Sequence, residues 1–282
     1  MTLKIALPNK GRLEQPATDL FKQAGFHFER TERSLAVPVR DAPIELLYVR
    51  AKDVVELVAD GAADLGVTGI DLTREAGAAV DTALELGFGR CSLVAAAPES
   101  SGIKALEDFA GMRIATSHPN IVDAFFKDKA IAVTTVPLAG SVEVAPRLDV
   151  ADAVVDLVSS GSTMLINGLR PVAELLPSQA VLIERTGVVR ADTSQTVITM
   201  LEAAMTARRK RYLVMNCAMD AVGTIAPIIP GIAAPTVVPL TASDMVAIHS
   251  VVDVSDVWHV LPRLKAAGAT GILVLPVQQV LV

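Results

Sequence analysis

A short loop rich in hydroxyl groups is the stretch of this sequence best suited to chemistry. Residues 154–163 read VVDLVSSGST, where an apolar run carries one acid, Asp156, and then gives way to Ser, Gly and Thr. This pattern predicts a strand, a tight turn and the start of a helix, since Gly favours turns and Ser and Thr favour helix N-caps. Backbone N–H groups and hydroxyls at such a turn can bind a phosphate. The predicted phosphate-binding loop consists of Ser159, Ser160, Gly161, Ser162 and Thr163.

The acid beside the loop narrows the kind of ligand. A Walker A loop would contain a lysine, and the dipeptide Gly-Lys occurs nowhere in the chain. A carboxylate directly before the loop can accept hydrogen bonds from paired sugar hydroxyls while the loop binds the phosphate of the same sugar. Asp156 could instead cap a turn or a helix. The favoured ligand is a sugar 5′-phosphate whose ribose hydroxyls lie on Asp156.

Cationic and polar side chains follow several predicted strands in the N-terminal part of the chain. The stretch TLKIALP predicts a strand that ends at Pro8, and IELLYVR predicts another that ends near Arg50. Ligands of open α/β sheets bind beyond the carboxyl ends of the strands, and cations there suit a polyphosphate. Each of these side chains could also be an ordinary surface charge. The candidates for this wall are Asn9, Lys10, Gly11, Arg12, Arg50, Lys52, Asp53, Thr68, Gly69 and Asp71.

Two segments of the chain resemble each other. Residues 53–72 and 140–165 both read helix, short link, Ala-Asp, apolar strand, Gly-containing turn and second helix, with Asp64 and Asp152 in the same place. The similarity predicts two alike lobes, each an open α/β sheet, around a cleft. Alternatively, two unrelated strand–helix units merely look alike. The second lobe would add Ser117, His118 and Asn120 to the cleft.

The elements divide the chain into three predicted domains. We expect the first lobe to comprise residues 1–92 and 180–208, with a helix at 194–208, and the second lobe to comprise residues 93–179. Residues 209–282 read β-α-β-β-α-β, the order of a ferredoxin-like unit. Such small domains are commonly regulatory or assembly modules.

Composition excludes several classes of function. The 282 residues carry a net charge of −6, which makes nucleic acid an unsuitable partner. Cys91 and Cys217 form no CxxC pair, and the four histidines are scattered, so neither a disulfide framework nor a metal cage built by the protein is indicated. The N-terminus lacks the apolar stretch of a signal peptide, and no run is long enough for a membrane span. We expect a cytoplasmic protein without a membrane partner.

Five motifs together carry a family resemblance. They are LPNKGRL at 7–13, GAADLGVTGIDL at 61–72, MRIATSHPN at 112–120, SVEVAPRLDVADAVVDLVSSGST at 141–163 and PGIAAPTVVPL at 230–240. With these motifs the whole chain resembles the ATP phosphoribosyltransferase (HisG) family of histidine biosynthesis, and the C-terminal domain is similar to that of the long form.

The resemblance implies a fold, a reaction and an assembly. The two lobes would be of the type II periplasmic-binding-protein kind, and the tail would be an ACT-like regulatory domain. The enzyme would be a glycosyltransferase that condenses ATP and phosphoribosyl pyrophosphate (PRPP) into phosphoribosyl-ATP and pyrophosphate, with N1 of adenine attacking C1 of the ribose. Mg²⁺ would be carried mainly on pyrophosphate rather than by protein ligands. Homodimers would assemble into homohexamers, with L-histidine as allosteric inhibitor.

The resemblance also implies residue roles, position by position. PRPP binding falls to Glu143, Asp152, Asp156, Ser159, Ser160, Gly161, Ser162 and Thr163. ATP or phosphate binding falls to Lys10, Gly11, Arg12, Arg50, Lys52, Gly69, Asp71 and His118. Binding of the regulatory histidine falls to Asn216, Ala218, Thr236 and Gly271.

Two positions depart from the family pattern. Ala218 stands where some long-form members carry a polar or acidic ligand, which predicts altered feedback inhibition. His118 stands where many members carry Tyr, so its stacking on a base is an open question.

A binding module of the same two-lobed fold, without catalysis, is the alternative. The expected lack of a signal peptide argues against a periplasmic carrier. The intact phosphate loop argues against a sensor of free amino acids.

Overall fold

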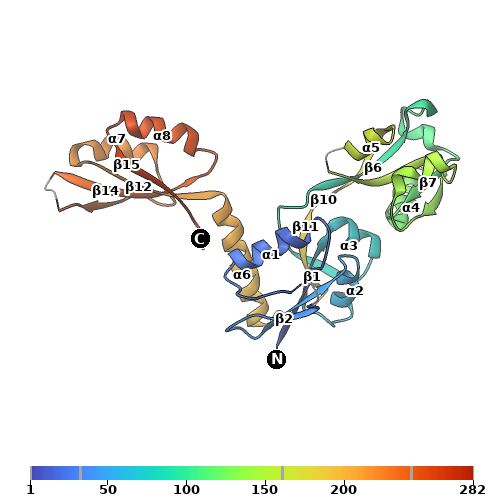
Figure 1. Cartoon of the computed structure of the whole chain (residues 1–282), viewed down its shortest axis with the longest axis horizontal. Helices are drawn as coiled ribbons and strands as arrows, with labels where there is room; N and C mark the ends of the chain where they lie inside the picture. The colour runs from blue at the N-terminus through green and yellow to red at the C-terminus, as the bar shows by residue number, and fades with distance from the viewer. Residues whose placement is uncertain (1, 32–33, 160–161, 242–243, 282) are drawn as a thin grey trace. The chain divides into compact units, whose positions relative to one another are not determined.

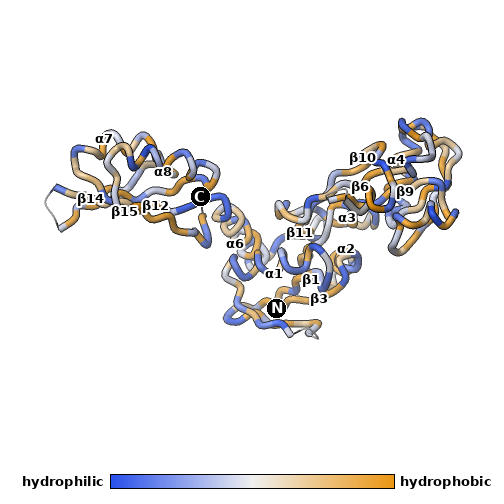
Figure 2. Tube along the Cα trace, turned by 45° about the horizontal axis from the view of Figure 1, so that its top comes forward, coloured by the Kyte–Doolittle hydropathy of each residue, from blue (hydrophilic) through white to orange (hydrophobic). Residues whose placement is uncertain are grey.

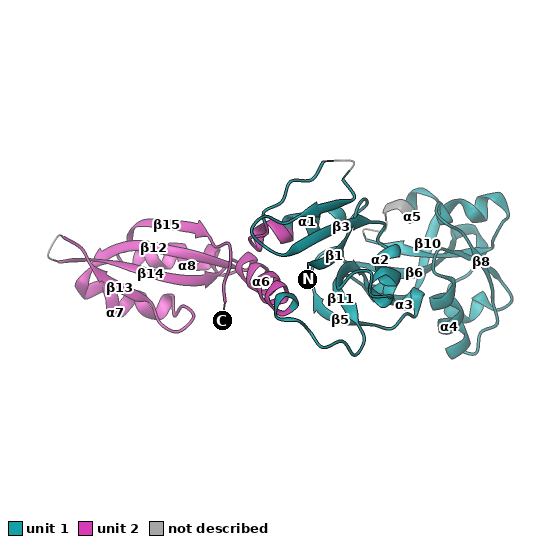
Figure 3. Ribbon diagram, turned by 90° about the horizontal axis from the view of Figure 1, so that it is seen from below, with its two compact units in different colours: residues 1–19, 27–194 teal, residues 20–26, 195–282 magenta. Residues whose placement is uncertain are grey.

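The computed structural model describes residues 2–31, 34–159, 162–241 and 244–281, and the side chains of 162 and 163 are outside the description. The fold is α/β (Figure 1). The chain divides into two compact units, one of residues 1–19 and 27–194 and one of residues 20–26 and 195–282 (Figure 3). Hydrophobic stretches alternate with hydrophilic ones along the whole chain (Figure 2), as expected for strands and helices that share buried cores.

The first unit contains a six-stranded sheet with strand order β2-β3-β1-β4-β11-β5. Strand β1 is parallel to β3 and β4, whereas β11 is antiparallel to β4 and β5. Residues 180–185, which we expected in the first lobe, therefore join the sheet that contains the N-terminal strand. The strands are β1 (Leu3–Pro8), β2 (Ala36–Pro38), β3 (Ile44–Val49), β4 (Leu65–Gly69), β5 (Val80–Glu85) and β11 (Ala180–Arg185). The helices are α1 (Glu14–Gln23), α2 (Asp53–Ala59) and α3 (Ile70–Ala76).

The same unit contains a five-stranded sheet with order β10-β6-β9-β7-β8. Its core packs aromatic rings of Phe109 and Phe126 against the buried strand residues Leu93 and Ile114. The strands are β6 (Cys91–Pro98), β7 (Arg113–Thr116), β8 (Thr134–Pro137), β9 (Ala153–Val158) and β10 (Leu169–Ser178). The helices are α4 (Pro119–Asp128), α5 (Ser162–Ile166) and the 3₁₀ segments η1 (Glu99–Ser101), η2 (Leu106–Phe109) and η3 (Val142–Leu148).

The two sheets repeat the same local structure, as the similarity of residues 53–72 and 140–165 predicted. The N–H of Asp64 donates to the carbonyl of Lys4, and its carboxylate accepts the N–H of Lys4, both at 2.8 Å. Asp152 makes the same pair of contacts with Arg113, also at 2.8 Å. Each acid directly precedes a strand, β4 or β9, that runs parallel to the strand it contacts.

The second unit contains a four-stranded antiparallel sheet with order β13-β14-β12-β15. Leu213, Met215 and Cys217 alternate along β12 and are buried with Val260 and Leu264 of α8, as expected for a sheet covered on one face. The strands are β12 (Lys210–Ala218), β13 (Thr236–Pro239), β14 (Met245–Asp253) and β15 (Thr270–Pro276). The helices are α6 (Asp192–Arg208), α7 (Val222–Ile225), α8 (Val257–Ala266) and the 3₁₀ segments η4 (Met219–Ala221) and η5 (Ala226–Ile228).

The β-α-β-β-α-β order predicted for the tail is thus present, with the strand order of a ferredoxin-like sheet. Among the described residues, no helix combines the length and the apolar character needed to span a bilayer.

Candidate functional site

Four predicted cations lie at one edge of the six-stranded sheet. Lys10 and Arg12 follow β1, and Arg50 and Lys52 follow β3, the parallel neighbour of β1. Their side chains are exposed. The N–H of Asn9 donates to the carbonyl of Val49 at 2.7 Å and so ties the two loops together.

The loop between Lys10 and Arg12 depends on a glycine. Gly11 has φ of 82°, in the left-handed region that L side chains rarely adopt. This turn directs the chain from the end of β1 into α1, which begins at Glu14. The predicted role of Gly11 is thus a matter of backbone conformation rather than of a side chain.

Arg30 contacts this loop and the start of α1, and the sequence pattern did not predict its role. Its guanidinium pairs with Glu14, donates to the carbonyl of Asn9 at 3.3 Å and lies 3.9 Å from the ring centroid of Tyr48. The charge and the stacking together hold the first turn of α1 and the end of β1 in place. No spacing rule distinguishes Arg30 from other loop arginines.

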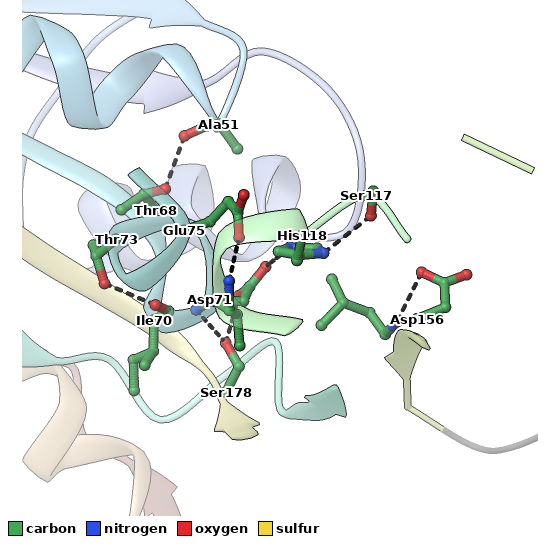
Figure 4. A network of polar contacts seen from close by, with 12 residues as sticks. Ala51, Thr68, Ile70, Asp71, Thr73, Glu75, Ser117, His118, Asp156 and Ser178 are labelled. Carbon is green, nitrogen blue, oxygen red and sulfur yellow. Dashed lines mark hydrogen bonds and ion pairs between the residues drawn. The ribbon is translucent and has the colours of Figure 1, made fainter. Parts of the chain in front are cut away.

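Asp71 is the buried centre of a polar network (Figure 4). The residue is 1% exposed. Its carboxylate accepts a hydrogen bond from Ser178, lies 3.4 Å from Nε2 of His118, and lies 3.7 Å from the guanidinium of Arg12. Burial acts to raise the pKa of Asp71, but the hydrogen bonds from His118 and Ser178 and the charge of Arg12 outweigh it and lower that pKa. Asp71 is therefore a charged anchor rather than a proton donor.

Gly69 makes room for this network. A Cβ on Gly69 would lie 2.2 Å from Oδ1 of Asp71, so a larger residue would displace the carboxylate. The neighbouring Thr68 donates its hydroxyl to the carbonyl of Ala51 at 2.8 Å. That bond joins the end of β4 to the loop that carries Arg50 and Lys52.

His118 is buried rather than open for stacking on a base. The ring is 4% exposed, with Nδ1 3.0 Å from the hydroxyl of Ser117. His118, which follows β7 of the five-stranded sheet, thus contacts Asp71, which follows β4 of the six-stranded sheet.

The predicted strand and helix around Asp156 are present as β9 and α5. The Asp156 carboxylate is half-buried and accepts the N–H of Leu157 at 2.8 Å. Burial chiefly raises the pKa of Asp156, and the charge of Glu143 raises it further. Glu143 lies on η3, whose Val142 and Ala145 pack with Val154 of β9, the strand that carries Asp156.

The loop itself is only partly described. Ser159 is exposed and lines a cavity. Ser160 and Gly161 lie outside the described residues, and Ser162 and Thr163 are described only as the first residues of α5.

The structure does not bring Asp152 to this loop. Asp152 precedes β9 and Asp156 lies within it. The two are four positions apart along an extended strand, which is about 13 Å. The Asp152 carboxylate is paired with Arg113 at 2.8 Å, and the hydrogen bonds from Arg113 lower its pKa. Like Asp64, Asp152 fixes the start of its strand to the neighbouring parallel strand.

A cavity of about 560 Å³ lies where the chain passes between the two sheets, from β5 to β6 and from β10 to β11. Ser159 brings the loop to this cavity, whose other polar lining residues are Glu85, Arg90, Ser92, Ser178 and Gln179. Ser178 also contacts Asp71, so the cavity adjoins the polar network. A cavity of this size and polarity can hold part of a nucleotide or sugar phosphate. These lining residues were missed because strand crossovers leave no local signal.

Two sequence models of one family match the chain. The model described as ATP phosphoribosyltransferase matches residues 50–206, and the model described as HisG, C-terminal domain, matches residues 207–279. An ATP phosphoribosyltransferase of Natronomonas pharaonis is 40% identical over 278 residues, with 98% of this chain and 99% of the relative covered. The chain belongs to the ATP phosphoribosyltransferase family. Another member, from Gemmatimonas aurantiaca, is 42% identical over 291 residues, with 99% of both chains covered.

Solved structures agree with this membership. The ATP phosphoribosyl transferase (HisG:HisZ) complex of Thermotoga maritima superimposes with a TM-score of 0.61 at 28% identity, over 71% of this chain and 98% of that one. Tv2483 bound to L-arginine reaches a TM-score of 0.51 at 14% identity, over 73% of this chain and 85% of that one, which shows likeness of fold alone. The predicted periplasmic-binding-protein type of fold is confirmed.

Family membership settles the type of reaction. ATP phosphoribosyltransferases are glycosyltransferases that catalyse the first step of histidine biosynthesis. Membership therefore favours the transferase over the non-catalytic binding module.

The ATP phosphoribosyltransferase family needs a divalent metal. Within the residues that the structure describes, no group of three or more His, Cys, Asp or Glu could hold a metal ion. Two carboxylates, Glu143 of η3 and Asp156 of β9, nevertheless lie on elements that pack together. Mg²⁺ usually keeps several waters and binds one or two carboxylates plus substrate phosphates. The side chains present fit an ion that arrives with a phosphate ligand.

The four positions assigned to regulatory histidine lie on the C-terminal sheet. Asn216 of β12 pairs with Ala247 on one side and Thr270 on the other. Gly271 is its close neighbour, because a Cβ there would lie 3.7 Å from Nδ2 of Asn216.

The other two of these positions are farther along or across the sheet. Ala218 lies two residues beyond Asn216 on the same strand and pairs with Met245. Thr236 lies on the edge strand β13, opposite His249. The structure thus brings Asn216 and Gly271 together more closely than Thr236.

Proposed function

We propose that this enzyme binds PRPP at the loop of residues 159–163 and ATP against the cations that follow β1 and β3. The observation that carries the proposal is the position of Ser178, which donates to Asp71 and lines the same cavity as Ser159 of the loop. Elements of the two sheets, one carrying cations and one carrying the loop, are thereby part of one polar site. A sugar phosphate and a triphosphate need such complementary walls.

In this proposal the loop and its acids bind PRPP. Backbone N–H groups and hydroxyls of residues 159–163 bind the 5′-phosphate, with the start of α5 contributing its N–H groups. Asp156 accepts hydrogen bonds from the ribose hydroxyls, and Glu143 assists in placing them. Asp152 is left out because its carboxylate is already paired with Arg113.

The cations bind the phosphates. Lys10, Arg12, Arg50 and Lys52 are exposed and contact ATP or the leaving pyrophosphate. Asp71 orients Arg12 and His118 through the contacts described above. His118 acts through its position beside Asp71 and not as an open stacking surface.

The reaction needs little proton transfer. Adenine N1 attacks C1 of the ribose with its own lone pair while pyrophosphate leaves, and N1 of the neutral ring carries no proton to remove. Catalysis therefore rests on orientation of the two substrates and on electrostatic stabilisation. The carboxylate of Asp156 stabilises positive charge that develops on the sugar, and the cations stabilise the departing pyrophosphate.

The divalent metal in this proposal is Mg²⁺, which would be held mainly by the substrate's pyrophosphate, with Glu143 and Asp156 as the carboxylates that could assist. The ion supplies charge neutralisation of the leaving group. Regulation by L-histidine at Asn216, Ala218, Thr236 and Gly271, assembly of homodimers into homohexamers, and a cytoplasmic location belong to the same proposal. They rest on the family resemblance.

The test is ultraviolet absorbance of the purified protein with ATP, PRPP and Mg²⁺, with pyrophosphatase present to draw the reaction forward. A rise from phosphoribosyl-ATP that depends on all three reactants is expected. The same rise with PRPP omitted, or no rise from folded protein, would contradict the proposal and favour a non-catalytic binding module.

A further inference from the structure

Helix α4 begins without a cap of its own. The first N–H groups of any helix have no acceptor within the helix. In α4 the first residue, Pro119, has no N–H, and the N–H of Val122 already donates to the carbonyl of His118 at 3.1 Å. The His118 side chain makes no cap hydrogen bond. The N–H groups of Asn120 and Ile121 are therefore the two that need an acceptor.

Glu75 supplies an acceptor to both. Its Oε1 accepts the N–H of Asn120 at 3.0 Å, and its Oε2 accepts the N–H of Ile121 at 3.0 Å. The Asn120 side chain donates in return to the carbonyl of Glu75 at 2.9 Å. A carboxylate at this end also complements the helix dipole.

The capping residue comes from the other sheet. Glu75 lies on α3, which follows β4 of the six-stranded sheet, whereas α4 follows β7 of the five-stranded sheet. Local caps lie next to their helix, but 45 residues separate Glu75 from Asn120. The cap therefore joins the two halves of the unit.

A second carboxylate, one turn earlier on the same helix, also contacts the start of α4. Asp71 and Glu75 are four residues apart, so they lie on one face of α3. Asp71 contacts the ring of His118, and Glu75 contacts the two residues after Pro119 (Figure 4). We name these two contacts the α3–α4 clasp. Two points of attachment fix orientation as well as distance.

We propose that Glu75 is a positioning residue, which holds the two sheets at the spacing where the loop at Asp156 and the cations after β1 and β3 act on substrates together. The inference rests on the proposed function for its consequence in catalysis, though not for the clasp itself. Glu75 touches no reacting atom in this scheme. Without the Glu75 carboxylate, some molecules would have the loop and the cations too far apart to bind substrates together. The apparent affinity for substrates would then fall in proportion to the fraction of molecules in which the two sheets keep the productive spacing.

The direct test is the spacing of the two sheets without substrates. Spin labels at Glu56→Cys on α2 and Glu107→Cys on η2, both exposed, report one distance across the two halves. Labelled chains are diluted with unlabelled chains, so that only distances within one chain are measured. Glu75→Gln is expected to broaden the distance distribution, and Glu75→Ala to broaden it further. The matched control is Glu99→Gln, whose exposed carboxylate has no partner among the described residues.

Two further readouts separate positioning from a general loss of structure. Hydrogen exchange of a peptide covering residues 118–128 is expected to speed up about tenfold at its first amides, as for loss of one charge-assisted hydrogen bond. Steady-state kinetics are expected to show KM for both substrates rising about tenfold, while kcat is retained because saturating substrates draw the walls together.

Three results would overturn the proposal. One is an unchanged distance distribution and exchange rate in folded Glu75→Gln and Glu75→Ala. Another is a widened distribution with unchanged KM. The third is a fall in kcat at unchanged KM, which would make Glu75 part of the catalytic machinery. A wild-type protein without transferase activity would refute the proposed function instead, and the distance and exchange measurements would still decide on the clasp.

Discussion

Asp64 and Asp152 make the same contacts at equivalent positions of the two sheets. Each carboxylate accepts the N–H of a residue in the neighbouring parallel strand, Lys4 or Arg113, at 2.8 Å. Each also precedes the strand that leads to a proposed binding turn. The equivalence identifies these acids as anchors of the strand starts, at the edge away from the site.

The first prediction concerns the stability of the Asp152 anchor. Asp152→Asn should lower the free energy of unfolding by about 1 kcal/mol, because one backbone hydrogen bond weakens and a screened, half-exposed ion pair is lost. KM for PRPP should stay unchanged. Urea unfolding and steady-state kinetics measure the two quantities, with Asp64→Asn as the matched variant. A raised KM for PRPP at unchanged stability would instead make Asp152 a ribose ligand.

Asp156 should behave in the opposite way, which gives the second prediction. Asp156→Asn should reduce kcat/KM for PRPP by about 10²- to 10³-fold, the range seen when a group that stabilises transition-state charge is removed. Stability should not fall, since burial and the charge of Glu143 already disfavour the carboxylate there. Thermal unfolding and initial rates measure both. The exposed Glu99→Gln variant controls for loss of one negative charge. Full turnover in Asp156→Asn would refute the site.

The sequence predicted those features of the fold that depend on local pattern. The strand β9 and the helix α5 follow from an apolar run and, after it, residues that favour helix N-caps. The helix predicted at 194–208 is present as Asp192–Arg208, and the Ala-Asp duplication has a structural counterpart. In each case neighbouring residues carry the information.

Contacts between distant segments were out of reach. Glu75 reads as an ordinary acid on a short helix, and only the structure places Asn120 and Ile121 beside it. Arg30 could not be predicted for the same reason, since its partners Glu14 and Tyr48 lie on other elements. The family resemblance assigned Asp152 to PRPP binding, and only the structure shows its carboxylate paired with Arg113, about 13 Å along the strand from Asp156.

The third prediction is that Asp71 and Asp156 affect stability with opposite dependence on pH. The pKa of Asp71 is lowered in the folded state, because hydrogen bonds and Arg12 outweigh burial, so its stabilisation is present above the unfolded pKa and is lost as pH falls through the folded one. The pKa of Asp156 is raised, mainly by burial, so the folded state binds the extra proton and stability falls as pH rises from the unfolded pKa through the folded one.

Urea unfolding of Asp71→Asn and Asp156→Asn across the acid range tests this pair. The stability deficit of Asp71→Asn should shrink as pH falls, because the wild-type carboxylate becomes protonated and no longer attracts its charged partners. The stability gain of Asp156→Asn should grow as pH rises toward neutral and then level off. Parallel curves for the two variants would show that the opposite pKa shifts of the two carboxyls are wrong.

The last prediction concerns the regulatory domain, where Asn216 and Gly271 are neighbours on β12 and β15. Gly271 has φ of 56°, a conformation that favours glycine, and a Cβ there would approach the Asn216 amide at 3.7 Å. Asn216→Ala should raise the concentration of L-histidine needed for half inhibition by about tenfold, as for loss of one hydrogen bond to a charged ligand. Gly271→Ala should raise it too, because the left-handed backbone at 271 is strained by a Cβ and would shift beside Asn216. Transfer rates without histidine should stay unchanged.

Ala218→Asp is the reciprocal variant, since a carboxylate on the same strand as Asn216 can pair with the amino group of histidine. It should lower the half-inhibition concentration, and isothermal titration of L-histidine should show tighter binding. Thr270→Ala controls for a change on β15 beside Gly271, because its hydroxyl donates only to the carbonyl of Asn216, at 3.3 Å. Inhibition that is unchanged in Asn216→Ala, Gly271→Ala and Ala218→Asp would place the histidine site elsewhere. An enzyme that histidine does not inhibit, but that gains inhibition with Ala218→Asp, would show that the alanine has silenced the sensor.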